Sequence, residues 1–244
     1  MRKYNYGSII LILIVNAIIS GILQNIADGN LSILSGFVAF IFDYLICRGL
    51  LYNREGSFSD YFRGIKTMTG KVFLMNILVG AITVILVLLA TLLSGAGSLV
   101  FYDFPIEIDS NSVVISLVVL YVLVMIFISL IFAYMNFFME DERYRDLTFF
   151  DSLKLILKAG IKLFSESFMA GVKAYKISLI SGAIVMVILL FTPLAGQIAL
   201  IFGVIAAIAF FLCTPPFRAS LSDIYMDRSE EIYEEFMRDK NFKG

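Results

Sequence analysis

The sequence predicts an all-α fold, a polytopic integral membrane helical bundle with about six transmembrane helices. Three observations lead to this prediction. First, 60% of the 244 residues are hydrophobic and only 16% are charged, with a mean hydropathy of +0.91, whereas soluble domains carry about 25% charged residues. Second, the apolar residues gather in runs close to the ~20 residues that cross a bilayer. Third, the basic residues occur only in alternate loops between those runs.

Residues 1–217 are expected to form the transmembrane domain. The first apolar run follows Arg2 and Lys3, as in a signal peptide, but no small-residue cleavage site comes after it, so we expect a retained helix. The last two runs are short and close together, which predicts a tight helical hairpin. The six expected spans are 6–23, 31–50, 72–93, 113–138, 174–191 and 197–213.

The distribution of basic residues predicts the orientation. All 19 lysines and arginines fall in the N-terminal pair, in 48–71, in 143–176 and in the tail from Arg218 onward. The segments 24–30 and 94–112 carry only acidic charges. Lysine and arginine are enriched in cytoplasmic loops. We therefore expect a multi-pass plasma membrane protein with both termini in the cytoplasm and 94–112 outside.

The cytoplasmic segments predict amphipathic helices. Ser57 and Thr148 each open a Ser/Thr-x-x-acid pattern, in which the hydroxyl caps free backbone N–H groups and the acid faces the positive end of the helix. The two acids, Asp60 and Asp151, are separated by an offset of 91 residues, and the same offset relates the apolar runs on either side. This offset predicts a parallel internal repeat.

The helix after the second pattern has a basic face. Lys154, Lys158 and Lys162 recur every four residues, so they share one side of a helix. We expect this stripe to face anionic lipid headgroups on the cytoplasmic side. The alternative is a surface helix packed beneath the bundle.

The tail, residues 218–244, is expected to be a cytoplasmic, acidic, amphipathic segment. A Ser-x-x-Asp pattern at Ser220 predicts that a new helix begins there. Its glutamates are typical of a solvated face, and the alternative is a docking site for a protein partner.

Asp43 is the outstanding polar residue of the second span. An unpaired carboxylate at bilayer depth costs about 3 kcal/mol on insertion scales. We therefore expect it to face the interior of the bundle and to contact a polar group, with Arg48, Asn76 and Asn136 as candidates. Two roles fit this intramembrane polar site: a cation or proton site, or a hydrogen-bonding partner that joins neighbouring spans.

Small residues recur every four positions along the last span, at Ala195, Ala199, Gly203 and Ala207. Such a face lets helix backbones approach closely in a membrane. We expect it to pack inside the bundle, and packing between the protomers of a homo-oligomer is the alternative.

Several short motifs carry a resemblance to known families. They are Arg48-Gly49, the run from Phe58 to Ile65, Ser152-Leu153-Lys154-Leu155, Lys162-Leu163-Phe164 and Pro215-Pro216-Phe217 followed by Ile224-Tyr225. Over roughly residues 45–226 the chain resembles uncharacterised bacterial six-span membrane families of unknown function. It is more loosely similar to the membrane domain attached to some glycerophosphodiester phosphodiesterases. The resemblance implies a bacterial helical bundle and no particular activity, and the chain departs from it through an insertion at 165–173.

The absence of histidine narrows the function. It removes Ser-His triads and HExxH zinc sites, and we expect no cofactor, metal ion or nucleic acid. The sequence therefore predicts a non-enzymatic membrane component of a transport or envelope-associated system. The alternatives are a self-sufficient secondary transporter with Asp43 as its ion or proton site, and a toxin-immunity or tolerance protein of the membrane.

Overall fold

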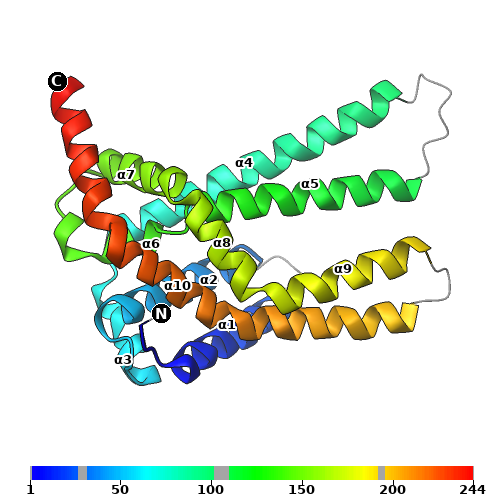
Figure 1. Ribbon diagram of the computed structural model, residues 1–244, viewed down its shortest axis with the longest axis horizontal. Coiled ribbons are helices and arrows are strands. Elements are labelled where there is room, and N and C mark those ends of the chain that lie inside the picture. Colours follow the sequence, from blue (N-terminus) through cyan, green and yellow to red (C-terminus); the bar gives the residue numbers. More distant parts are fainter. Residues whose placement is uncertain (1, 27–31, 102–109, 192–195, 244) are drawn as a thin grey trace.

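The computed structural model describes residues 2–26, 32–101, 110–191 and 196–243, and these residues form helices and turns but no strand (Figure 1). Six long helices form three antiparallel hairpins. These are α1 (Tyr6–Ile26) with α2 (Ser32–Tyr52), α4 (Gly70–Phe101) with α5 (Ser110–Ile131), and α9 (Lys176–Phe191) with α10 (Gly196–Lys243). The predicted tight pairing of the last two spans is confirmed by the third hairpin.

Five of these helices are long and apolar enough to cross a membrane, and a sixth span arises if α9 is counted with the bent helix α8 that precedes it. The predicted membrane helical bundle is therefore confirmed. The expected fourth span, 113–138, corresponds to the candidate span Val119–Glu140, which contains a break between the end of α5 at Ile131 and a short helix, α6 (Met135–Glu140).

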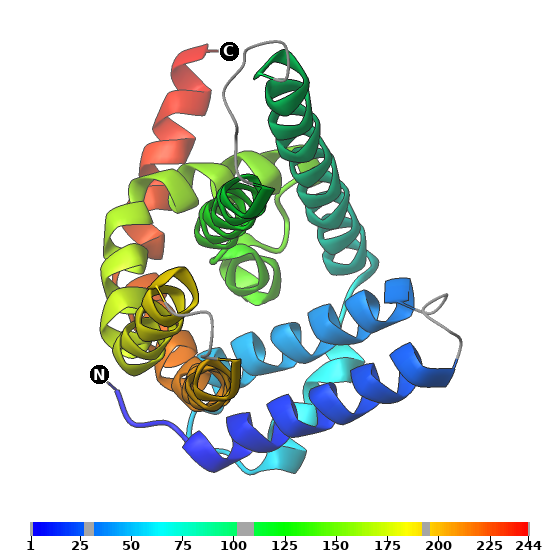
Figure 2. The same ribbon diagram turned by 90° about the vertical axis from the view of Figure 1, so that its right-hand side faces the viewer.

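The second and third hairpins extend in the same direction, and the connecting helices lie at their other end together with both chain termini (Figure 1). The first hairpin runs across this direction, because α1 and α2 are seen from the side in the view that shows α9 and α10 nearly end on (Figure 2). This second layer, called here the platform, contains α3 (Phe58–Phe62), η1 (Arg63–Thr67), α6, η2 (Glu142–Tyr144), α7 (Phe149–Lys162), α8 (Phe164–Ala174) and the second half of α10. In the view of Figure 2 the three hairpins diverge from one another. Their main contacts are within each pair and with the platform.

The best-packed part of the core lies in the platform. Tyr225 of α10 is fully buried, and its ring meets Phe137, Phe138 and Tyr134 at centroid distances of 5.3, 4.9 and 6.4 Å. Aromatic rings at such separations contribute beyond their buried area. The apolar cluster therefore fixes α10 against α6.

Both predicted helix starts are confirmed. Ser57 and Asp60 form a capping box at α3, and the Thr148 hydroxyl accepts a hydrogen bond from the Asp151 amide at α7. The helices that follow differ in length, with 5 residues in α3 and 14 in α7. The two caps are compatible with the internal repeat, which remains a prediction.

The tail is not separated from the last span. α10 continues through Pro215 and Pro216 to Lys243, so the expected boundary after residue 217 and the expected helix start at Ser220 fall inside one helix of 48 residues. A proline removes the hydrogen bond to the carbonyl four residues earlier. The carbonyl oxygen of Leu212, which Pro216 leaves free, instead accepts a 2.8 Å hydrogen bond from the Tyr6 hydroxyl. This contact explains how the helix persists past its prolines.

Gly160 sets the distance between the platform and the second hairpin. A Cβ atom at this position would lie 1.9 Å from the carbonyl oxygen of Ile131. Only glycine permits this approach of α7 to the end of α5.

Candidate functional site: a polar junction beneath three hairpins

Asp43 lies at the centre of a polar junction, defined here as Asp43, Asn76, Asn136 and Arg218. One carboxylate oxygen of Asp43 forms an ion pair with the Arg218 guanidinium, and the other accepts a 2.7 Å hydrogen bond from the Asn136 amide. The Asn136 oxygen in turn accepts a 3.2 Å hydrogen bond from Asn76. Asp43 therefore has the polar partners that its position requires.

The junction draws on all three hairpins. Asp43 belongs to α2, Asn76 to α4, Arg218 to α10, and Asn136 to α6 directly after α5. The side chains of Asp43 and Arg218 remain 27% and 26% exposed. The junction is thus a partly accessible ionic contact that ties the hairpins together where they enter the platform.

Arg48 was one of the three expected partners of Asp43, and this prediction is wrong, because Arg48 pairs with Glu140 instead. Its Nε lies 2.7 Å from the carboxylate of Glu140, whose side chain is only 5% exposed. The same carboxylate accepts hydrogen bonds from the Tyr44 hydroxyl and, at 3.2 Å, from the Thr67 hydroxyl. The physical reason is reach: Arg48 is more than one helical turn from Asp43, whereas Glu140 faces it from another helix.

Asp141, next in the chain, forms a separate buried cluster. It accepts hydrogen bonds from Arg143 at 2.6 Å and from the Tyr225 hydroxyl at 2.9 Å. Burial by itself would raise the pKa of Asp141, but the Arg143 hydrogen bonds outweigh it and hold that pKa below its ordinary value. The same hydrogen bonds raise the pKa of Arg143. Asp141 is therefore ionised at neutral pH and anchors α10 through Tyr225.

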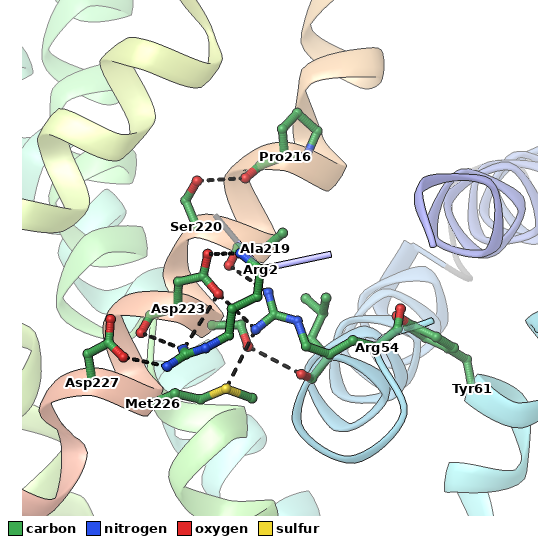
Figure 3. Close-up of polar contacts among 11 residues, drawn as sticks. Arg2, Arg54, Tyr61, Pro216, Ala219, Ser220, Asp223, Met226 and Asp227 are labelled. Carbon is green, nitrogen blue, oxygen red and sulfur yellow. Dashed lines mark hydrogen bonds and ion pairs between the residues drawn. The ribbon is translucent and has the colours of Figure 1, made fainter. Parts of the chain in front are cut away.

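A further ionic cluster fastens the N-terminus to α10 (Figure 3). The Arg54 guanidinium lies 2.8 Å from the Asp223 carboxylate, and its side chain is 11% exposed. Arg2 donates to the Asp227 carboxylate at 2.6 Å, and its backbone N–H donates to Asp223 at 3.1 Å. The carbonyl of Arg54 also accepts a 3.0 Å hydrogen bond from the Tyr61 hydroxyl. This cluster, called here the N-terminal clasp, joins the chain start, the α2–α3 turn and α10.

The expected lipid-facing lysine stripe is wrong for two of its three members. The Lys158 ammonium lies 2.6 Å from Asp239, and Lys162 lies 2.9 Å from Glu231 and 2.5 Å from Glu235. The basic face of α7 thus meets the acidic face of α10, because opposite charges on two adjacent helices attract. The hydrogen bonds that Lys162 donates to Glu235 and Glu231 raise its pKa. Lys154 is exposed, and its contact with lipid remains a prediction.

The small-residue face of the last span is not packed inside the protein at its described positions. Nothing lies within 4 Å of a Cβ built on Gly203, and Ala207 is exposed. Ala195 lies outside the described residues, as does the side chain of Ala199. The contact with α9 uses another side of α10, where the Ser178 hydroxyl donates to the Ala206 carbonyl at 2.9 Å. The expected internal packing is therefore wrong for Gly203 and Ala207.

Sequence reasoning missed Arg218 and Glu140 as partners. Arg218 lies five residues after the expected end of the last span, in the expected tail, and it is the first basic residue after that span. Glu140 lies just after the fourth apolar run and Arg48 lies at the end of the second, so the sequence places opposite charges at the same end of two spans. Pairing each charge at a span end with those at other span ends would have found both contacts.

In the polar junction and in the clusters beside it, acidic side chains are paired with arginines of the same chain. In the described residues, no three histidine, cysteine, aspartate or glutamate side chains are grouped so that they could hold a metal ion. Each carboxylate of Asp43, Glu140, Asp141 and Asp223 contacts a guanidinium of the same chain. The arrangement can hold helices together, and it can respond to the loss of a charge.

No protein family model, no curated protein and no solved structure matches this chain. The resemblance to six-span bacterial families therefore stays a prediction. The fold and the chemistry of the described residues carry the functional argument.

Proposed function

We propose that this multi-pass membrane protein is a non-enzymatic membrane component of a transport or envelope-associated system. It acts by contact: its hairpins complete their packing on lipid and on the transmembrane helices of a partner. The observation that carries the proposal is the contrast between the two halves of the molecule. The platform is closely packed, whereas the hairpins stand apart and leave large apolar side chains exposed along their length.

The apolar exposure of the second hairpin illustrates this contrast. Leu88 of α4 is 56% exposed and Leu123 of α5 is 58% exposed. Helices in a bilayer gain stability by close packing and by hydrogen bonds rather than by the hydrophobic effect. Two-helix hairpins that hardly touch one another therefore offer sides on which further helices can pack.

The contacts of the Asp43 carboxylate support a structural role over a coupling role for this residue. Both carboxylate oxygens of Asp43 are engaged, one by an arginine that does not deprotonate in proteins. A secondary transporter that used Asp43 as its ion or proton site would first have to break this pair. A contact-based component needs the pair intact.

Photo-crosslinking in living cells tests the proposal. The photoreactive amino acid p-benzoylphenylalanine replaces Leu88 or Leu123, and Tyr225, which is fully buried, serves as the matched control position. We expect a discrete adduct with one other membrane protein from the two hairpin positions and none from Tyr225. Adducts with lipid alone, together with solute uptake by the purified protein in vesicles, would refute the proposal in favour of a self-sufficient transporter.

A further inference from the structure

The helix α8 presents its faces in an unusual way. Its small residues Ser167 and Gly171, four positions apart, point toward the protein, while Phe168, Met169 and Val172 point away. These three apolar side chains are 46%, 49% and 38% exposed. In a helix that packs on a water-soluble core the large apolar residues face inward. The outward face of α8 therefore calls for an apolar surrounding outside the protein.

The inward face of α8 is firmly held. The Ser167 hydroxyl lies 2.6 Å from the hydroxyl of Tyr134 and is fully buried. A Cβ on Gly171 would lie 3.4 Å from the Phe217 ring, so α8 and α10 are in close contact there. At the end of α8 the Tyr175 ring stacks on Phe210 at 4.6 Å. The orientation of the outward face is thus fixed by contacts on the opposite side of the helix.

The position of α8 identifies the apolar surrounding. A single residue, Tyr175, separates α8 from the apolar helix α9, and the two helices are bent by 72°. A helix that turns sharply where a span begins lies near the membrane surface. An amphipathic helix with apolar side chains on its outer face lies in the headgroup region with that face buried.

A groove of about 630 Å³ runs between α8 and α10 at this level. Its polar lining includes Lys173, Ser165 and Glu166 of α8 and Ser220 of α10. Its apolar lining includes Met169, Ala170, Ala174, Pro216 and Ile224. Lys173, Ala174 and Pro216 lie at the end of the groove nearest the third hairpin, because α9 follows the first two and the apolar part of α10 precedes Pro216. A cation at a membrane boundary, beside apolar side chains, matches a lipid phosphate above its acyl chains.

We propose that α8 lies in the headgroup layer of the membrane and that the groove between α8 and α10 binds a glycerophospholipid, with its phosphate on Lys173. The lysine is exposed, and in the described part of the chain it has no ion pair, unlike Lys158 and Lys162. The acyl chains lie against Met169 and continue along α9. This inference concerns a lipid site on the platform, so it stands or falls separately from the partner of the hairpins.

Native mass spectrometry of the full-length protein tests the binding site. Delipidated protein in a neutral detergent is titrated with phosphatidylglycerol, and the bound lipids are counted. Lys173→Gln is compared with Lys176→Gln, which removes an exposed lysine three residues away that does not line the groove. We expect Lys173→Gln to weaken the tightest lipid by about fivefold, the effect of one lysine near a lipid surface, and Lys176→Gln to change it by less than about twofold.

A second variant and a competitor complete this test. Ala170→Phe places bulk in the groove and leaves every charge in place, so it should also weaken the tightest lipid. Excess inorganic phosphate should not displace phosphatidylglycerol, because the acyl chains contribute to binding. Equal lipid retention by wild type, Lys173→Gln and Ala170→Phe overturns the site. Displacement by free phosphate overturns the lipid as its ligand.

The absence of tryptophan from the chain gives an independent test of the depth of α8. Phe168→Trp introduces one fluorophore on the outward face, and Glu234→Trp, on the exposed far end of α10, is the matched control. In nanodiscs with brominated lipids, we expect strong quenching of the tryptophan at position 168 and little at 234. Equal, weak quenching of both would show that α8 lies in water.

Discussion

The ion pair between Asp43 and Arg218 gives the sharpest test of the polar junction. In Arg218→Gln, Asp43 keeps its 2.7 Å hydrogen bond from Asn136 but loses its only positive partner among the described residues. Breaking a fully buried pair costs ~3–5 kcal/mol. Both side chains are about a quarter exposed, so solvent screening reduces the cost, and we expect about 2 kcal/mol. For a chain of 244 residues this corresponds to a fall in melting temperature of about 4–8 °C.

The matched variant removes both charges. Asp43→Asn retains an oxygen that can accept from Asn136, so the double variant Asp43→Asn/Arg218→Gln leaves no unpaired charge. We expect it to be more stable than Arg218→Gln alone, with a coupling energy of at least ~1 kcal/mol in the double-mutant cycle. As a control, Arg63→Gln removes a surface ion pair in which the arginine side chain is 77% exposed, and no change is expected.

Thermal unfolding in detergent can be followed by a thiol-reactive fluorophore, because Cys47 is fully buried in the fold and becomes reactive when the fold opens. Additive effects of the two substitutions would refute the reasoning. They would mean that Asp43 and Arg218 do not stabilise each other, and that the junction does not join α2 to α10.

Three other predictions follow from the fold. Gly160→Ala should strongly destabilise the protein in the same unfolding assay, because the new Cβ would lie 1.9 Å from the Ile131 carbonyl oxygen. Gly203→Ala should not, because nothing lies within 4 Å of its Cβ. Equal melting temperatures of the two variants would contradict the close approach of α7 to α5. The hydrogen bond from Lys240, and then that from Thr148, lowers the pKa of Asp151 from 3.8, so the Asp151–Lys240 contact stabilises the end of α10 above pH 3.8 and is lost as the pH falls through the lowered pKa. We expect faster hydrogen exchange in the last turns of α10 at that pH. The same change in Asp151→Asn would disprove that titration of Asp151 is the cause. Finally, in a variant without Cys47 and Cys213, an impermeant thiol reagent should modify intact cells with Ser110→Cys but not with Lys154→Cys, as the charge distribution requires; the reverse pattern would invert the orientation.

The fold class was predictable because it depends on local properties. The length and hydropathy of each apolar run predict a span wherever the run lies in the chain, and the capping residues Ser57 and Thr148 act within three residues of themselves. The prediction of a separate tail failed for a non-local reason. Prolines such as Pro215 and Pro216 normally end a helix, because Pro216 has no N–H to donate to the Leu212 carbonyl. Here the hydroxyl of Tyr6, near the other end of the chain, donates a hydrogen bond to that carbonyl instead.

The site was predictable only in part, for the same reason. The energy of a buried carboxylate required that Asp43 have a polar partner, and Asn136 was among those expected. Spacing along the chain does not tell which charge lies nearest in space, so Arg218, 175 residues from Asp43, was missed, whereas Arg48, five residues from Asp43, was one of the three candidates. The lysines of α7 likewise matched a lipid-binding stripe, because their acidic partners lie some 70 to 80 positions further along the chain.

The unbroken course of α10 has a mechanical consequence. At 1.5 Å per residue its 48 residues extend about 72 Å, from the far end of the third hairpin to beyond the platform. Pro215 and Pro216 lie within it, at the place where helices bend most easily. About 40 Å of helix lies beyond that point, and this part is held against the platform through Tyr225, Asp223 and Glu235. A tilt of the third hairpin therefore has to be absorbed as a bend at Pro215 and Pro216, or transmitted through these contacts to α6, α2 and α7.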